Sequence, residues 1–242
     1  MEYKLLTRKE KRKERQQNIP REKQSFELKQ IDPLTKNQRR AFEAFDNGKN
    51  LLLHGTAGTG KSFLSLYLAI RDCTAKNSTF NNVVLVRSVV PTRDMGYLPG
   101  DVAEKTAVYE APYVAMCTEL FNRSDAYEIL VKTCKLRFIS TSFVRGSTFN
   151  NAIIVVDEFQ NCSGHELNSI ITRLGKNCRI IFSGDFSQSD LKYNQKDISN
   201  FMSVIKEMNS FSHIEFNSTD ICRSNIVKEY IITRDKLGIS FI

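Results

Sequence analysis

The chain of 242 residues is 41% hydrophobic and 26% charged, a composition ordinary for one large soluble domain with its own core. Its net charge is +8, no apolar run approaches the roughly 18 residues of a membrane span, and the N-terminus lacks the apolar core of a signal peptide. The six cysteines form no C-x-x-C pair, so the composition excludes a membrane-spanning or disulfide-rich secreted protein and predicts a cytoplasmic one.

Residues 1–33 contain few large apolar side chains and no sustained period, which predicts a flexible arm. The net charge is concentrated here, because residues 1–40 hold 13 Lys or Arg against 6 Asp or Glu and the rest of the chain holds 22 against 21. The densest run lies between Arg8 and Arg15 and is typical of contact with nucleic acid phosphates. A solvated arm that only aids solubility is an equally good interpretation.

After the arm, short apolar runs alternate with segments of helical period. Thr35 and Gln38 fit a capping box that begins a helix, and Gly48 fits its end. Buried strands are expected at 51–54, 83–86, 136–140, 152–156 and 179–182, and further helices at about 63–70, 103–121, 125–133, 164–174, 198–208 and 223–236. Continuous apolar strands separated by helices are typical of an α/β fold, with a mostly parallel sheet and helices on both faces.

The first expected strand runs directly into residues 55–62, a complete G-x-x-x-x-G-K-[ST] phosphate-binding loop. Its glycines let successive N–H groups point at a phosphate, and the following helix adds the positive end of its dipole. Lys61 would reach the β- and γ-phosphates, and the Ser62 hydroxyl would ligate Mg²⁺. A glycine-rich turn with a chance lysine explains the motif and its flanks poorly, so the loop predicts binding of a nucleoside triphosphate. The residues expected around the phosphates are Gly55, Thr56, Ala57, Gly58, Thr59, Gly60, Lys61 and Ser62.

Asp157 and Glu158 follow the fourth expected strand without a gap. A carboxylate at this position beside the loop is suited to organise Mg²⁺, and Glu158 could orient or deprotonate a water that attacks the γ-phosphate. The fifth strand leads into residues 183–188, where Gln188 could hydrogen-bond the γ-phosphate or the attacking water. The alternatives are a strand that ends in solvated acids and an ordinary Gly-Asp turn.

Five segments taken together resemble the PhoH family of single-domain P-loop ATPases. They are GTAGTGKS at 55–62, RSVVPTRDMGYLPGD at 87–101, FVRGSTF at 143–149, IIVVDEFQN at 153–161 and FSGDFSQSDL at 182–191. The loop and the DE pair are shared with many ATPases, whereas the LPGD, RG-x-TF and DE-x-QN segments are much more specific to this family. The resemblance covers about residues 34–235 and implies a RecA-like core similar to the first motor domain of superfamily-1 helicases. The sequence departs from the family at Phe159, where alanine is usual.

The resemblance also implies ATP and Mg²⁺ as cofactors, with the loop residues around the phosphates. It assigns Ser62 and, through water, Asp157 to Mg²⁺, and it assigns Glu158 to activation of the attacking water. Gln188 matches a γ-phosphate sensor. Gln38 matches the adenine-reading glutamine that precedes the first strand in such ATPases, although it also fits the helix cap.

An arginine is also expected, because charge that develops on the γ-phosphate must be neutralised. Arg145, Arg173 and Arg223 are the candidates, although each could instead form a surface ion pair. We favour Arg223, because family members carry a similar D-x-x-R near the C-terminus. Helicases place this arginine on a second motor domain, for which this chain is too short, so a neighbouring subunit could supply it. This predicts a homo-oligomer such as a ring.

The expected organisation is therefore a basic arm over residues 1–33 and an ATPase domain over residues 34–242. The leading hypothesis is ATP hydrolysis coupled to RNA or single-stranded DNA, with Arg87 and Arg93 either contacting phosphate or lying in a merely structural loop. The alternative is an ATP-dependent switch or assembly protein whose arm docks a protein partner. A small-molecule kinase is disfavoured, because the DE pair and Gln188 suit activation of water, which a kinase must exclude.

Overall fold

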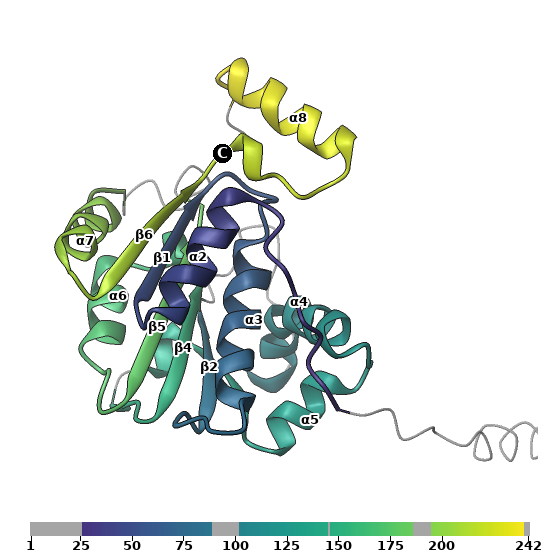
Figure 1. Ribbon diagram of the computed structural model, residues 1–242. Helices are drawn as coiled ribbons and strands as arrows, with labels where there is room; N and C mark the ends of the chain where they lie inside the picture. The colour runs from purple at the N-terminus through teal and green to yellow at the C-terminus, as the bar shows by residue number, and fades with distance from the viewer. Residues whose placement is uncertain (1–25, 89–101, 145, 186–194, 240–242) are drawn as a thin grey trace, which may run out of the picture.

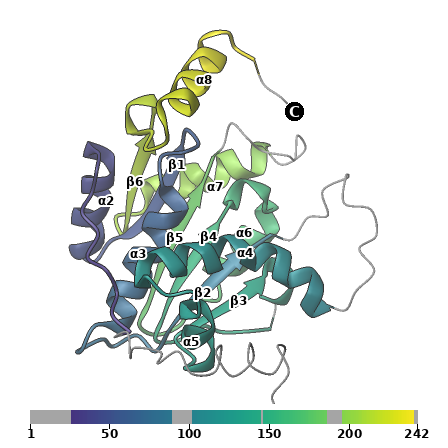
Figure 2. The same cartoon turned by 90° about the vertical axis from the view of Figure 1, so that its right-hand side faces the viewer.

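The computed structural model describes residues 26–88, 102–144, 146–185 and 195–239. In these residues, helices cover both faces of a central six-stranded sheet (Figures 1 and 2). The strands are β1 (Asn50–Gly55), β2 (Asn82–Arg87), β3 (Leu136–Ser140), β4 (Ala152–Asp157), β5 (Cys178–Gly184) and β6 (Phe211–Phe216). Their order is β3-β2-β4-β5-β1-β6, and every neighbouring pair is parallel. The expected α/β class with a parallel sheet is confirmed.

The helices divide between the two faces of the sheet because successive side chains of a strand point to opposite faces. Leu51 and Leu53 of β1 pack in one core cluster, whereas Leu52 packs in the other. The first cluster is completed by α2 (Lys36–Asp46), α3 (Lys61–Thr74), α4 (Val102–Phe121) and α5 (Ala126–Lys132). The second is completed by α6 (Gly164–Ile171) and α7 (Gln195–Glu207). The last helix, α8 (Asn225–Lys236), stands beyond the edge where the strands end (Figure 1).

Strand β6 has no counterpart among the expected elements. Its sequence, FSHIEF, mixes polar and apolar residues because β6 lies at the edge of the sheet, where Ile214 and Phe216 are buried and Glu215 is exposed. Helix α6 ends at Ile171, short of the expected residue 174, since Leu174 already forms a bridge with Phe149. Both differences come from tertiary pairing that no local pattern signals.

Part of the segment expected to be a flexible arm packs against the domain. The ring of Phe26 stacks on Phe121 at 4.4 Å between centroids, and the amide of Lys29 donates to the carbonyl oxygen of Leu120 at 2.9 Å. The amide of Ile31 donates to a tyrosine hydroxyl of α3 at 3.2 Å. Residues 26–33 therefore belong to the folded body, which corrects the expected boundary, while residues 1–25 lie outside the described residues.

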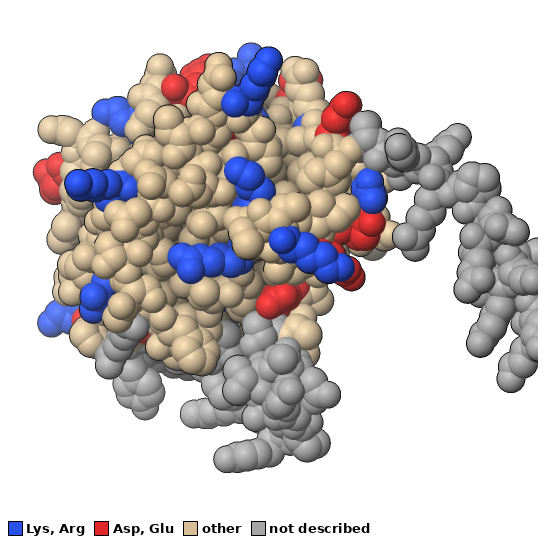
Figure 3. Space-filling model, turned by 90° about the horizontal axis from the view of Figure 1, so that it is seen from below, with Lys and Arg blue, Asp and Glu red and all other residues tan. Residues whose placement is uncertain are grey.

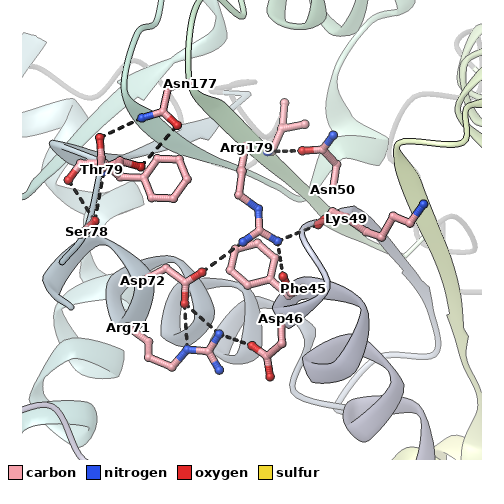
Figure 4. A network of polar contacts seen from close by, with 12 residues as sticks. Phe45, Asp46, Lys49, Asn50, Arg71, Asp72, Ser78, Thr79, Asn177 and Arg179 are labelled. Atoms are coloured by element: carbon pink, nitrogen blue, oxygen red, sulfur yellow. Dashed lines mark hydrogen bonds and ion pairs between the residues drawn. The ribbon is translucent and has the colours of Figure 1, made fainter. Parts of the chain in front are cut away.

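A polar network closes the edge of the sheet where the strands begin, opposite the phosphate loop (Figure 4). Arg179 of β5 donates to the carbonyl oxygens of Phe45 and Lys49 and forms an ion pair with Asp72 at 3.1 Å. Its guanidinium also lies 3.4 Å from the centre of the Phe45 ring, and Asp72 forms a second ion pair with Arg71 at 2.8 Å. One arginine thus joins the ends of α2 and α3 to the start of β5.

Candidate functional site

The ends of three neighbouring strands bring the main expected site residues together. Strands β4, β5 and β1 are adjacent in the sheet, and parallel strands place their carboxyl ends at one edge. β1 leads into the loop 55–62, β4 ends at Asp157, and β5 ends at Gly184. In an open α/β sheet this edge is where ligands bind.

The loop is already folded around its own lysine. Gly60, the N-cap of α3, has a φ of +82°, in the left-handed region that glycine adopts most easily. Lys61 is only 8% exposed, and its Nζ donates to the carbonyl oxygens of Gly55 and Thr56 at 2.7 and 2.8 Å. The buried Thr59 hydroxyl donates to the Thr56 carbonyl oxygen at 2.9 Å, which closes the loop further. The motif therefore forms a closed loop at the start of α3, and its role in phosphate binding stays a prediction.

Asp157 is the centre of the polar contacts at this edge. Its Oδ1 accepts hydrogen bonds from the hydroxyls of Ser62 at 2.7 Å and Ser183 at 2.5 Å, and its Oδ2 accepts one from the Tyr113 hydroxyl at 2.9 Å. Mg²⁺ prefers such oxygen ligands, and the hydrogen bond shows that Ser62 and Asp157 lie close enough to serve one ion. These two residues could therefore hold the ion. Ser183 and Tyr113 were not singled out from the sequence, because they reach Asp157 only through the fold.

Lys61 faces a group of carboxylates. Burial lowers the pKa of Lys61, and the negative charges of Asp185, Glu158 and Asp157 partly offset that effect. Asp185 directly follows β5 and is only 5% exposed. The sequence indicates it only as part of a Gly-Asp turn, although its position after a strand next to β1 could have identified it.

The backbone of Glu158 adopts a strained conformation. Its φ is +52°, in the left-handed region, which costs a residue other than glycine of order 1 kcal/mol and is often found at functional sites. Burial, and then the neighbouring Asp157, raises the pKa of its carboxyl group. Gln160 donates from Nε2 to Glu158 and accepts at Oε1 from the amide of Asp185 at 3.1 Å. Gln160 thus joins the ends of β4 and β5 and orients Glu158, a role that the sequence did not reveal.

Several expected residues lie outside the described residues. They are Gln188, in the segment 186–194, and the arginines Arg93 and Arg145. Their assignments stay predictions.

Gln38 lies against the loop, as its proposed role requires, but its side-chain amide has protein partners. Nε2 donates to the Thr59 carbonyl oxygen at 3.1 Å, and Oε1 accepts from the amide of Leu34 at 2.8 Å. The Thr35 hydroxyl caps α2 by accepting from the Gln38 amide at 3.2 Å, as predicted. The return bond of a capping box is absent among these described residues, because the Gln38 side chain bonds Leu34 instead of Thr35.

Arg223 lies beside the loop of its own chain. The amide of Cys222 donates to the Gly58 carbonyl oxygen at 3.0 Å, and Cγ of Arg223 would be 3.1 Å from a Cβ on Gly58. Arg173 lies elsewhere, since its carbonyl oxygen accepts from the amide of Phe149 at the edge where the strands begin. Of the two candidate arginines that are described, only Arg223 is near the expected phosphate site.

Arg87 ends β2 in register with Asp157 on β4. Its positive charge lowers the pKa of Glu158, although the larger effect of burial prevails, and it interacts with the Tyr113 hydroxyl. Arg87 therefore faces the candidate site rather than forming part of a separate loop surface.

The chain is similar to proteins of one known family. The family model described as PhoH-like protein matches residues 30–233. The PhoH-like protein of Bacillus subtilis (strain 168) is 30% identical over 213 residues, which are 86% of this chain and 65% of the relative. The protein PhoH of Escherichia coli (strain K12) is 29% identical over 190 residues, 77% of this chain and 53% of the relative. The chain thus spans only between half and two thirds of the length of these relatives.

The fold also resembles solved structures. The large terminase from a thermophilic bacteriophage has a TM-score of 0.50 at 10% identity, over 87% of this chain and 52% of the terminase. The Pif1 helicase from Candida albicans has a TM-score of 0.38 at 18% identity, over 77% of this chain and 40% of the helicase. At such identities the likeness concerns the fold alone. Among the described residues, no helix is both long and apolar enough to cross a bilayer.

Proposed function

The chain belongs to the PhoH-like family of P-loop NTPases, and from this premise we propose that it hydrolyses ATP with Mg²⁺ and couples hydrolysis to RNA or single-stranded DNA. The observation that carries the catalytic part is the Asp157 carboxylate, which bonds Ser62 of the phosphate loop and Ser183 of β5 at once. The proposed Mg²⁺ ligands and the proposed phosphate loop therefore lie next to each other, which supports one joint site. The six cysteines are free in the structure, which is compatible with a cytoplasmic protein.

Each side chain has a proposed part in the reaction. The loop amides and Lys61 would hold the phosphates, and Ser62 and Asp157 would hold Mg²⁺, which when bound neutralises phosphate charge. Glu158 would take a proton from the attacking water, and its raised pKa supports this role because a stronger base accepts a proton more readily. Gln188 would sense the γ-phosphate.

Gln38 and Arg223 would complete the site from two sides of the loop. Gln38 would contact adenine, which its position beside Thr59 supports, provided that its side-chain amide exchanges a protein partner for the base. Arg223 would neutralise phosphate charge from within the same chain, since its segment is already bonded to Gly58. A homo-oligomer remains part of the proposal, although in this arrangement Arg223 of the same chain would supply the arginine.

Coupling to nucleic acid rests on charge and on family likeness. The surplus of Lys and Arg falls within residues 1–40, most of which lie outside the described residues. On the face seen in Figure 3, Lys and Arg side chains lie at separate places among uncharged residues, with Asp and Glu between them. The proposed nucleic-acid contact therefore depends mainly on the basic N-terminal residues and not on that face.

One observation favours a protein partner instead. Helix α8 stands away from the sheet (Figure 1). Its apolar side chains Ile226 and Tyr230 are 76% and 56% exposed, and Leu237, just after the helix, is 64% exposed. Apolar side chains grouped on a projecting helix suit a protein contact better than a phosphate backbone. The second candidate function is thus an ATP-dependent switch or assembly protein.

ATP turnover of the full chain, with and without single-stranded RNA or DNA, separates the two candidates. Lys61→Ala provides the blank, and Lys132→Ala is the matched control, because Lys132 is an exposed lysine of α5. Stimulation of Lys61-dependent turnover by either polymer, weakening as salt rises, supports the coupled motor. Turnover that depends on Lys61 but ignores both polymers rejects the coupling and favours the switch.

A further inference from the structure

A buried tyrosine contacts the metal-site carboxylate from helix α4. Tyr113 is only 1% exposed, and its hydroxyl donates to Oδ2 of Asp157 at 2.9 Å. The other oxygen, Oδ1, is used by Ser62 and Ser183. Each carboxylate oxygen thus has separate donors, and Tyr113 serves the oxygen that the two serines do not.

This arrangement fixes the rotation of the carboxylate. Without the Tyr113 hydroxyl, Oδ2 would be left short of a donor in a site where Asp157 is 4% exposed, and the group could turn to share its remaining donors. Such a turn would change the direction of the oxygen that faces Ser62. Outer partners of metal ligands act in this way, and their removal typically costs about 10–100-fold in metal affinity.

The same hydroxyl also connects the site to the end of β2. Arg87, in register with Asp157, interacts with the Tyr113 hydroxyl. Arg87 is also the first residue of the segment 87–101, of which residues 89–101 lie outside the described residues.

We propose that Tyr113 is a positioning residue, which orients the Asp157 carboxylate for Mg²⁺ and links that carboxylate to Arg87. The inference rests on the proposed function, because it needs a metal–nucleotide site at Asp157. It goes beyond that function by assigning part of the metal affinity to a side chain of α4 that touches neither phosphate nor water in the proposed reaction.

The test compares two buried tyrosines that each donate a hydrogen bond to a carboxylate, only one of which is at the proposed metal site. Tyr127 of α5 is also buried, at 6% exposed, and its hydroxyl donates to a carboxylate oxygen of Glu110 at 3.0 Å. Tyr113→Phe and Tyr127→Phe therefore each remove one tyrosine–carboxylate hydrogen bond from the same layer of helices. Binding of a fluorescent ATP analogue by the full chain is titrated in Mg²⁺ and in EDTA, and Mn²⁺ binding is followed by electron paramagnetic resonance.

Tyr113→Phe is expected to weaken Mn²⁺ binding and the Mg²⁺-dependent part of nucleotide binding by about 10–100-fold, with binding in EDTA unchanged. Tyr127→Phe is expected to match the wild type in all three measurements. Equal metal dependence in the two variants, or an equal loss in Mg²⁺ and in EDTA, would overturn the inference and leave Tyr113 as a core residue. A wild-type chain whose nucleotide binding ignores both Mg²⁺ and Lys61→Ala would instead reject the proposed function itself.

Discussion

Any side chain at Gly55 should destabilise the fold. This glycine joins β1 to the loop at a φ of +114°, and a Cβ there would lie 2.0 Å from the carbonyl oxygen of Phe216 on β6. That oxygen also accepts from the Thr56 amide at 3.0 Å. Gly55→Ala therefore forces β6 away from β1 and breaks a hydrogen bond at the entrance of the loop.

The expected destabilisation has three parts. The unfavourable φ costs about 1–3 kcal/mol, and the lost hydrogen bond about 1 kcal/mol, with disturbed packing of the edge strand added. Gly48→Ala is the matched control, because Gly48 has a φ of +79° and nothing within 4 Å of a Cβ. We expect a loss of about 3–5 kcal/mol for Gly55→Ala and about 1–2 kcal/mol for Gly48→Ala.

Urea unfolding followed by far-ultraviolet circular dichroism measures both values on one scale. The difference between the two variants isolates the contact with β6, since both carry a strained backbone. If Gly55→Ala were no less stable than Gly48→Ala, the close approach of β6 to the loop would be refuted.

Two further predictions also concern stability. Burial, with His213 and nearby lysines, lowers the pKa of His54 from 6.5 to about 4. The folded state thus takes up a proton less readily than the unfolded state, and stability present above pH 6.5 should fall by up to about 3 kcal/mol as the pH drops toward 4. The urea midpoint should depend less on pH between 6.5 and 4 in His54→Leu than in the wild type. His165→Asn, which replaces an exposed histidine, should keep the wild-type pH dependence. An equal pH dependence in the two variants would contradict the assignment. Arg179→Met should lower the free energy of unfolding by about 2–4 kcal/mol, because it removes the centre of the network in Figure 4. Lys132→Met, which breaks an exposed ion pair, should lower it by less than about 0.5 kcal/mol. Similar losses in the two variants would show that the network contributes little to stability.

The parts of the fold that could be predicted are the elements that have a recognisable local sequence pattern. The four inner strands appear as mainly apolar runs, as at Val83–Val86, and all five expected strands, including the edge strand β3, are present. Strand β6 was not predicted, because its sequence contains no continuous apolar run and its partner β1 lies far away in the sequence. The boundary of the arm was misjudged because residues 26–33 are held by contacts with α3 and α4 rather than by their own pattern.

The candidate site divides in the same way. The loop and the Asp157–Glu158 pair are contiguous motifs whose spacing carries their chemistry, so the sequence sufficed to find them. Tyr113, Ser183 and Gln160 come from separate elements and meet Asp157 or Glu158 only in the folded chain. A lone tyrosine or serine has no distinguishing spacing, and therefore only the packing of α4, β4 and β5 reveals these partners.

The most direct test of the account is the activity of Glu158→Gln, because the substitution keeps size and hydrogen bonding but removes the proposed base. Glu128→Gln, an exposed glutamate of α5, is the matched control. The account predicts that Glu158→Gln still binds ATP while its single-turnover hydrolysis rate falls by about 10²–10⁴-fold, and that Glu128→Gln behaves as wild type. Hydrolysis by Glu158→Gln at close to the wild-type rate would contradict it.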